Sequence, residues 1–274
     1  MTCRVFVSAD IEGVAGIVTG LQTSDTGRQY HEGRELMTDE VNAAIAGAFD
    51  GGATDVVVCD SHAAMQNLIP ARLDERAVLV RGAMRDSLQM EGMDGSFHAV
   101  FITGTHGRAG TADAVLDHTW NGTTVYNLRI NGLAVNEAEL NALVAGRFGV
   151  PVALVTGDEA TLAQIRETLP ETIMVPVKTG RGRGVAVSLH PKEACRRIRA
   201  GAAEAVRKRG TIPVPRVPTP LVMEIDYNRT DMAQTAALVP GVTRIAPRTV
   251  RVEADPDTMF RIQELIVYRL RYEL

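Results

Sequence analysis

The most constraining feature of this sequence is a short apolar run, Val5 to Ala9, that ends directly in the carboxylates of Asp10 and Glu12. The run has the length of a buried β-strand and is far too short to span a membrane. Alternate residues of a strand point to the same face, so Asp10 and Glu12 would lie side by side if the strand continues. Two adjacent carboxylates repel each other unless a cation holds them, and a divalent metal ion does this well.

The same pattern recurs along the chain. Residues 55–60 lead into His62, residues 99–105 lead into His106, and residues 151–157 form a further apolar run that ends in acids. Helical patterns separate these runs, which is typical of a parallel α/β fold. Ligands of open parallel sheets bind beyond the carboxyl ends of the strands, so we expect these Asp, Glu and His side chains to meet at one edge.

The fold class that we predict is α/β, with a mainly parallel sheet flanked by helices and a smaller α+β portion at the C-terminus. The sequence pattern changes after about residue 176, where the basic, glycine-rich segment 178–184 predicts a mobile loop. The alternative for this segment is that it holds an anionic substrate group. We therefore expect an α/β metal-binding catalytic domain at residues 1–180 and a smaller α+β domain at residues 181–274.

Several local signals predict individual elements. Residues 14–37 are rich in turn formers and predict a long loop over the site. Thr38 predicts the N-cap of a helix that ends at Gly51-Gly52. Asn131-Gly132 predicts a hairpin turn, and the spacing of Asn136 and Glu139 predicts a capping box at the start of a helix.

Composition limits the compartment and the partners. A net charge of −4 and a pI near 5.9 argue against nucleic acid or an anionic membrane surface as a partner. The three cysteines, Cys3, Cys59 and Cys195, cannot all pair and show no CxxC spacing, so we expect reduced thiols. The sequence shows no signal-peptide pattern and no apolar stretch long enough for a membrane span, so we expect a cytoplasmic protein.

Five side chains at these positions supply mixed carboxylate and imidazole ligands: Asp10, Glu12, His62, His106 and Glu137. Such a set suits Zn²⁺ or Mn²⁺ better than Mg²⁺. It exceeds what one tetrahedral zinc ion needs, so we expect two metal ions that share a carboxylate. A metal pair can activate water and polarise a carbonyl, which predicts a hydrolase. Taken singly, each residue has a structural alternative as a turn residue, a hydrogen-bonded histidine or an acid that favours the helix dipole.

His118 follows His106 past a glycine-bearing loop, so it could face the same pocket without binding metal. An imidazole in that position is suited to proton transfer, and the alternative is a loop histidine that makes a local hydrogen bond. Asp60 and Asp117 each neighbour a candidate histidine. Each could orient that imidazole or could simply be solvated at the surface.

Several motifs spread over nearly the whole chain carry a family resemblance: Ser8–Gly13, Asp60–His62, Asn67-Leu68, Gly104–Ala109, Val135–Glu137, Leu140-Asn141, Gly157-Asp158 and Leu238–Gly241. In these motifs the chain resembles the D-aminopeptidase family of DppA type, which are binuclear zinc peptidases. The resemblance implies that Asp10 bridges two zinc ions, that Glu12 and His62 complete one site, and that His106 and Glu137 complete the other. It also implies that His118 is catalytic.

We therefore expect a cytoplasmic, zinc-dependent aminopeptidase that acts on short peptides. A preference for D-residues, and assembly as a homodecamer of stacked five-membered rings around an internal channel, are implied by the resemblance alone. Two alternatives stay open, namely another binuclear metal hydrolase acting on a cyclic amide or ester, and a non-catalytic protein that binds a small ligand. A Rossmann nucleotide module is disfavoured because no GxGxxG motif follows the first strand.

Overall fold

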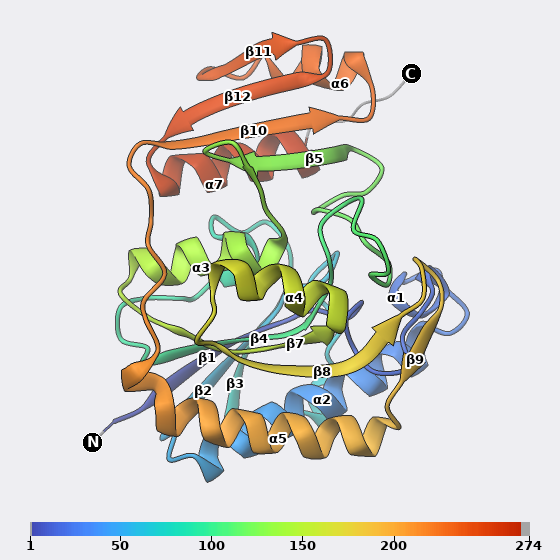
Figure 1. The fold of residues 1–274 in the computed structure, drawn as a ribbon, viewed down its shortest axis with the longest axis vertical. Helices are drawn as coiled ribbons and strands as arrows, with labels where there is room; N and C mark the ends of the chain where they lie inside the picture. The colour runs from blue at the N-terminus through green and yellow to red at the C-terminus, as the bar shows by residue number, and fades with distance from the viewer. Residues whose placement is uncertain (1, 270–274) are drawn as a thin grey trace.

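The computed structural model describes residues 2–269, which form two stacked parts (Figure 1). The larger part contains a seven-stranded sheet in the order β3-β2-β1-β4-β7-β8-β9, in which only the β8–β9 pair is antiparallel. Its strands are β1 (Arg4–Ala9), β2 (Asp55–Asp60), β3 (Ala77–Val80), β4 (Ala99–Thr105), β7 (Val152–Asp158), β8 (Ile173–Gly180) and β9 (Ala186–Ser188).

Helices cover both faces of this sheet, which explains why its central strands are mainly apolar and buried. Helices α2 (Tyr30–Asp50) and α5 (Pro191–Lys208) pack together on one face, and α3 (Glu137–Arg147) and α4 (Glu159–Thr168) lie on the other (Figure 1). Every residue of β4 and β7 is buried, as expected for strands that are covered on both sides. The predicted α/β class with a mainly parallel sheet is confirmed.

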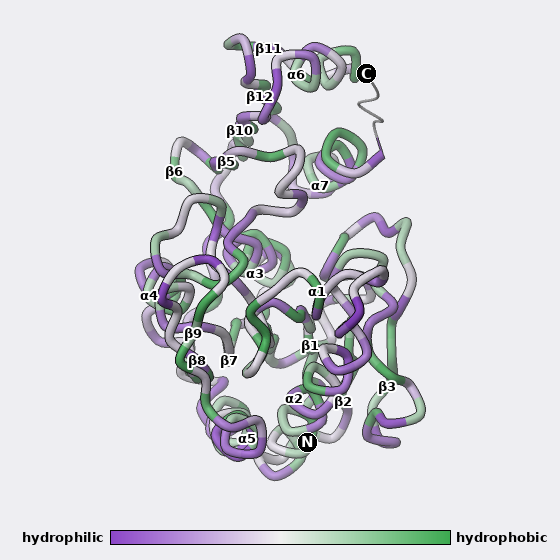
Figure 2. Tube along the Cα trace, turned by 90° about the vertical axis from the view of Figure 1, so that its right-hand side faces the viewer, coloured by the Kyte–Doolittle hydropathy of each residue, from purple (hydrophilic) through white to green (hydrophobic). Residues whose placement is uncertain are grey.

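The smaller part is an antiparallel sheet in the order β11-β12-β10-β5-β6, with its own apolar core. Its elements are β5 (Val125–Ile130), β6 (Leu133–Ala134), β10 (Leu221–Tyr227), α6 (Thr230–Ala236), β11 (Val242–Ala246), β12 (Thr249–Ala254) and α7 (Pro256–Glu264). In Figure 1 and Figure 2 this part lies above α3, which lies between it and the parallel sheet. Short helical segments complete the described chain: α1 (Gly20–Thr23), Pro70–Arg72, Leu88–Met90, Arg209–Thr211 and Leu265–Arg269.

The expected domain boundary at residue 180 does not coincide with the division between the two sheets. Strands β5 and β6 precede residue 180 in the chain yet belong to the antiparallel sheet. Helix α5 follows residue 180 yet packs against α2 on the parallel sheet. The chain crosses between the two parts more than once, so a composition change at a single position could not locate the division.

The strand order creates a crevice beside the central strand. From β1 the chain builds outward through β2 to β3 on one side, and then through β4, β7 and β8 on the other. The helical connections diverge where the order reverses, so a crevice opens beyond the carboxyl ends of β1 and β4. The candidate ligands that follow these two strands therefore lie at the topological switch point.

Helix α2 starts earlier than the sequence suggested. The predicted loop at 14–37 was too long and the predicted N-cap at Thr38 was wrong, because α2 begins at Tyr30. Thr38 lies inside the helix, where its hydroxyl donates to the Arg34 carbonyl at 2.7 Å. Gly33, a residue type typical of turns, is needed here for close packing, because a Cβ at this position would lie 2.0 Å from the carbonyl oxygen of Gln22. Close backbone packing leaves no local sign in the sequence.

The prediction for the basic segment 178–184 is also wrong in part. The prediction of a mobile loop at 178–184 was wrong for Lys178, which is buried within β8 and only 3% exposed. The glycines that follow form the turn between β8 and β9, and Gly182 adopts a positive φ of 115°. The segment is therefore a hairpin at the edge of the parallel sheet.

Other local signals are confirmed. Asn131 and Gly132 have φ of 48° and 83° and form the turn between β5 and β6. Asn136 and Glu139 form the predicted capping box at the start of α3. The three cysteines are free. Within residues 2–269, the helices are too short or too polar to cross a bilayer.

Candidate metal centre

Four strand or helix ends deliver the five candidate ligands to the crevice. Asp10 and Glu12 follow β1, His62 follows β2, His106 follows β4, and Glu137 is the first residue of α3. The side chains of four of them are at most 7% exposed, and that of His62 is 12% exposed. The sequence therefore correctly predicted that these residues would come together at one edge of the sheet.

Asp10 lies at the centre of the cluster. Its Oδ1 is 3.2 Å from His62 Nδ1, and its Oδ2 is 3.5 Å from His106 Nε2. On the first side Glu12 Oε2 lies 3.1 Å from His62 Nδ1, and on the second side Glu137 Oε1 lies 3.2 Å from His106 Nε2. The two oxygens of one carboxylate thus face two different groups, each made of one imidazole and one further carboxylate.

The outer hydrogen bond of His62 determines which nitrogen faces the carboxylates. His62 Nε2 lies 3.0 Å from the carbonyl oxygen of Thr23, and a carbonyl can only accept. Nε2 therefore carries the proton, and in the neutral ring Nδ1 presents a lone pair to Asp10 and Glu12. The oxygen Glu12 Oε2 is buried and has no hydrogen-bond donor.

His106 repeats this arrangement on the other side. Its Nδ1 lies 3.1 Å from the Gly107 carbonyl oxygen, so the proton resides there and Nε2 faces the carboxylates of Asp10 and Glu137. In the neutral ring, the nitrogen lone pair and the carboxylate oxygens that it faces repel each other unless a positive charge lies between them. A divalent cation removes this repulsion and satisfies Glu12 Oε2 as well, so the residues fit a metal site of mixed N and O ligands.

The field inside the cluster is strongly negative. Burial, together with the neighbouring Glu12 carboxylate, raises the pKa of Asp10 to about 7. Burial alone would lower the pKa of His106, but the Glu137 and Asp10 carboxylates raise it to about 10. Neighbouring carboxylates contribute to both shifts, although burial is the larger cause for Asp10 and opposes the shift of His106, so three buried carboxylates in a small volume favour an added positive charge.

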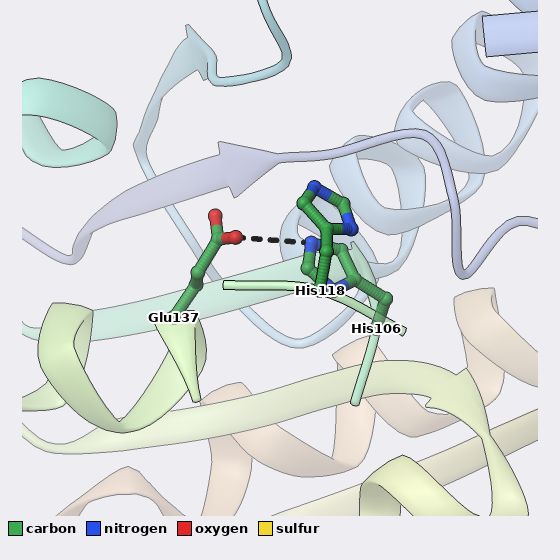
Figure 3. Close-up of side chains that lie close together, drawn as sticks. All are labelled: His106, His118 and Glu137. Atoms are coloured by element: carbon green, nitrogen blue, oxygen red, sulfur yellow. Dashed lines mark ion pairs between the residues drawn. The ribbon is translucent and has the colours of Figure 1, made fainter. Parts of the chain in front are cut away.

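His118 lies against the cluster rather than between the carboxylates. Its ring stacks on the ring of His106 with centroids 3.9 Å apart and planes 9° apart, as Figure 3 shows. Its Nδ1 lies 2.8 Å from the Leu116 carbonyl oxygen, which leaves Nε2 as the basic nitrogen. Burial and the nearby His106 lower the pKa of His118. His118 also lines a cavity of about 280 Å³, together with Tyr126 and Asn228.

Among residues 2–269, two triads place a possible ligand atom of each member within 4.8 Å of the others. One triad is Asp10, Glu12 and His106, and the other is His106, His118 and Glu137. The second triad brings His118, the predicted proton-transfer histidine, close to two of the candidate ligands, His106 and Glu137. The sequence did not indicate that the two imidazoles stack.

Glu137 is held by contacts that the sequence did not predict. Gln89 Nε2 donates to Glu137 Oε2, and the Trp120 backbone N–H donates to Glu137 Oε1 at 2.8 Å. Asn141 in turn donates to the side-chain oxygen of Gln89 at 2.6 Å. This chain of hydrogen bonds turns Oε1 of Glu137 toward His106. Gln89 stands in no recognisable motif, so only the fold identifies it.

The two aspartates that neighbour candidate histidines do not orient them. Asp60 is buried and accepts the backbone N–H of Leu68 at 2.7 Å, which shapes the loop that carries His62. Asp117 pairs with Arg183 at 2.6 Å. The imidazoles are tied to backbone carbonyls instead, so surface solvation was also the wrong alternative for Asp60.

The chain is similar to known proteins over nearly its whole length. The sequence matches the D-aminopeptidase family over residues 3–265. A D-aminopeptidase of Bacillus subtilis (strain 168) is 31% identical over 267 residues, which cover 96% of this chain and 95% of the relative. The solved structure of the Bacillus subtilis Zn-dependent D-aminopeptidase DppA, described as a self-compartmentalizing protease, is similar with a TM-score of 0.94. The two chains are 30% identical over 98% of this chain and 99% of that one.

Proposed function

Because this chain belongs to the D-aminopeptidase family, and is therefore a metal-dependent aminopeptidase, we propose that it releases N-terminal D-amino acids from short peptides with two zinc ions per subunit. The observation that carries the proposal is the convergence of five buried carboxylate and imidazole side chains around Asp10. Membership of this family argues against the two alternatives, a hydrolase of cyclic amides or esters and a non-catalytic binding protein.

Each half of the cluster supplies a ligand set in this proposal. Glu12 and His62 would hold one zinc ion, His106 and Glu137 would hold the other, and the two oxygens of Asp10 would bridge them. The backbone carbonyls support these assignments, because each one holds the outer N–H of its imidazole, and a bound cation would replace the proton on the inner nitrogen that faces the carboxylates. When bound, the metal pair supplies Lewis acidity and lowers the pKa of water toward neutrality.

His118 is the residue that we assign to proton transfer. Its Nδ1–H is tied to Leu116, so Nε2 is the nitrogen that can take a proton from water and return it to the departing amine. The stack on His106 holds the ring against the metal cluster, and the other side of His118 lines the adjoining cavity. This position lets the imidazole meet a substrate without joining the ligand set.

We also propose that the chain assembles as a homo-oligomer, specifically a decamer, in the cytoplasm. The description of the related DppA structure as self-compartmentalizing supports assembly, and the free cysteines support a reducing compartment. An enclosed site would restrict substrates to short peptides. Native mass spectrometry of the purified protein tests this directly, and a monomer would contradict it.

The function is tested by measuring zinc content and turnover on the same preparation. We expect about two zinc ions per subunit, and hydrolysis of D-alanyl dipeptides but not of their L-isomers or of a lactam panel. Asp10→Asn, which weakens the shared ligand, should lose both zinc ions and turnover. A wild-type protein that binds no zinc with all five side chains intact would refute the metal centre, and equal turnover of L-peptides would refute the stereochemical preference.

A further inference from the structure

Lys178 is a buried lysine whose three donors all go to one loop. It lies in β8 and is 3% exposed. Its Nζ donates to the backbone carbonyl oxygens of Glu12 at 2.5 Å, Val14 at 2.9 Å and Ile17 at 2.7 Å. A lysine ammonium has three N–H donors, so all of them are used. The loop between β1 and α1 is thus folded around a single cation.

This loop leads away from the metal cluster and is held from other sides as well. The Gly13 N–H donates to the Gly104 carbonyl oxygen at 2.7 Å, which ties the loop to β4. The Ala15 N–H donates to Glu40 Oε1 at 2.8 Å, which ties it to α2. Lys178 is the only one of these anchors that contacts the backbone of Glu12 itself.

The chemistry of this contact is unusual for a merely structural lysine. Burying an ammonium costs free energy, and buried lysines normally recover it by pairing with a carboxylate. Here the contacts are neutral carbonyls, and the carboxylates of Asp158, Glu40 and Glu12 act on Lys178 only through the field. Three carbonyl dipoles that point at one spot repel one another, so the loop conformation depends on the cation at its centre.

We propose that Lys178 is a positioning residue of the metal centre, whose ammonium gathers the carbonyls of the Glu12 loop and so fixes the Glu12 carboxylate beside His62. The inference rests on the proposed function, because it concerns the ion that Glu12 and His62 would hold. The other half of the centre has separate supports, since Gln89 and Trp120 hold Glu137. Loss of the lysine should therefore weaken one metal ion and spare the other.

The test is a zinc titration against a competing chelator. Wild-type protein should bind two zinc ions, and Lys178→Met should bind one of them about 10- to 100-fold more weakly, the usual effect of removing a group that orients a ligand. Lys208→Met, which removes an exposed lysine paired with Glu204, is the matched control and should bind as wild type does. A lysine with a purely structural role would lower the melting temperature without this selective loss.

A double-mutant cycle locates the effect. In a Glu12→Gln background, Lys178→Met should cause little further loss of zinc affinity, because the ligand that it positions is already impaired. Additive losses in the cycle, or two zinc ions bound with wild-type affinity by Lys178→Met, would overturn the proposal.

A second substitution covers the case in which methionine does not fold. Lys178→Arg keeps a buried cation, but its planar guanidinium cannot donate to three converging carbonyls at once. This variant should therefore fold and bind the same zinc ion more weakly. If circular dichroism shows that neither variant folds, the lysine is required for the fold itself and the specific role is overturned. Fewer than two zinc ions in the wild type would instead refute the two-metal proposal, whatever the variants do.

Discussion

Glu40 offers a prediction about stability that does not depend on the candidate metal ligands. This carboxylic acid lies in α2, is 2% exposed, and accepts the Ala15 N–H through Oε1, while Oε2 has no hydrogen-bond partner. Burial raises its pKa to about 7, although the Ala15 N–H and the field of Lys178 oppose the rise. The protonated acid is therefore the form that the fold prefers.

The sign and size of the effect follow from linkage. Below about pH 4.5 the acid is protonated in both the folded and the unfolded chain, so its stabilising contribution is fully present. Between about 4.5 and about 7 the unfolded chain releases the proton first, and this contribution is lost as the pH rises through the folded pKa. At about 1.4 kcal/mol for each pH unit, the total is about 3 kcal/mol.

Glu40→Gln tests this reasoning because glutamine has the shape of the protonated acid and does not titrate. We expect wild type and variant to have similar free energies of unfolding near pH 4.5, and the variant to be about 3 kcal/mol more stable at pH 8. Urea unfolding of metal-stripped protein across this range measures the difference, in which titrating groups that do not interact with Glu40 cancel. A difference that stays constant with pH would refute the argument.

Three further substitutions test the site. His118→Ala should retain both zinc ions and lose about 10²- to 10⁴-fold in kcat, since it removes a proton-transfer group but no ligand; near-normal turnover would refute the role. Gln89→Leu leaves Glu137 Oε2 buried without its donor, so one zinc ion should bind about 10- to 100-fold more weakly in chelator competition, and unchanged binding of both would contradict this support. Gly13→Ala would place a Cβ 2.0 Å from the backbone oxygen of Thr105, so the loop must shift, and we expect a lower melting temperature and reduced zinc content. A variant with wild-type values of both would show that the loop tolerates the displacement.

The convergence of the candidate ligands could be predicted from the sequence because they mark the ends of recognisable elements. Asp10, His62 and His106 each follow an apolar run, and parallel strands bring their carboxyl ends to one edge. Glu137 follows the capping residue Asn136, so the start of α3 was also visible. Each of these strand and helix ends is marked by residues close to it in the sequence. The rule that parallel strands bring their carboxyl ends to one edge applies to α/β sheets in general.

The supporting residues could not be predicted, because their contacts are remote in sequence. Lys178 meets carbonyls more than 160 positions away, and Gln89 meets Glu137 across 48 positions. Neither lies in a pattern that distinguishes it from a surface residue. The early start of α2 was missed for a related reason, since Gly33 is needed by a neighbouring segment rather than by its own helix.

Trp120 links the part of the sequence that carries the candidate residues to the antiparallel sheet. Its backbone N–H holds Glu137, while its indole packs in the core of the antiparallel sheet, edge-on to Tyr268 with centroids 6.1 Å apart. Strand β5, just downstream, pairs with β10 from the last quarter of the chain. A truncated polypeptide ending before β10 would contain all six candidate residues and still lack the strand that pairs with β5, so the residues that align the site extend well beyond the segment that carries the candidates.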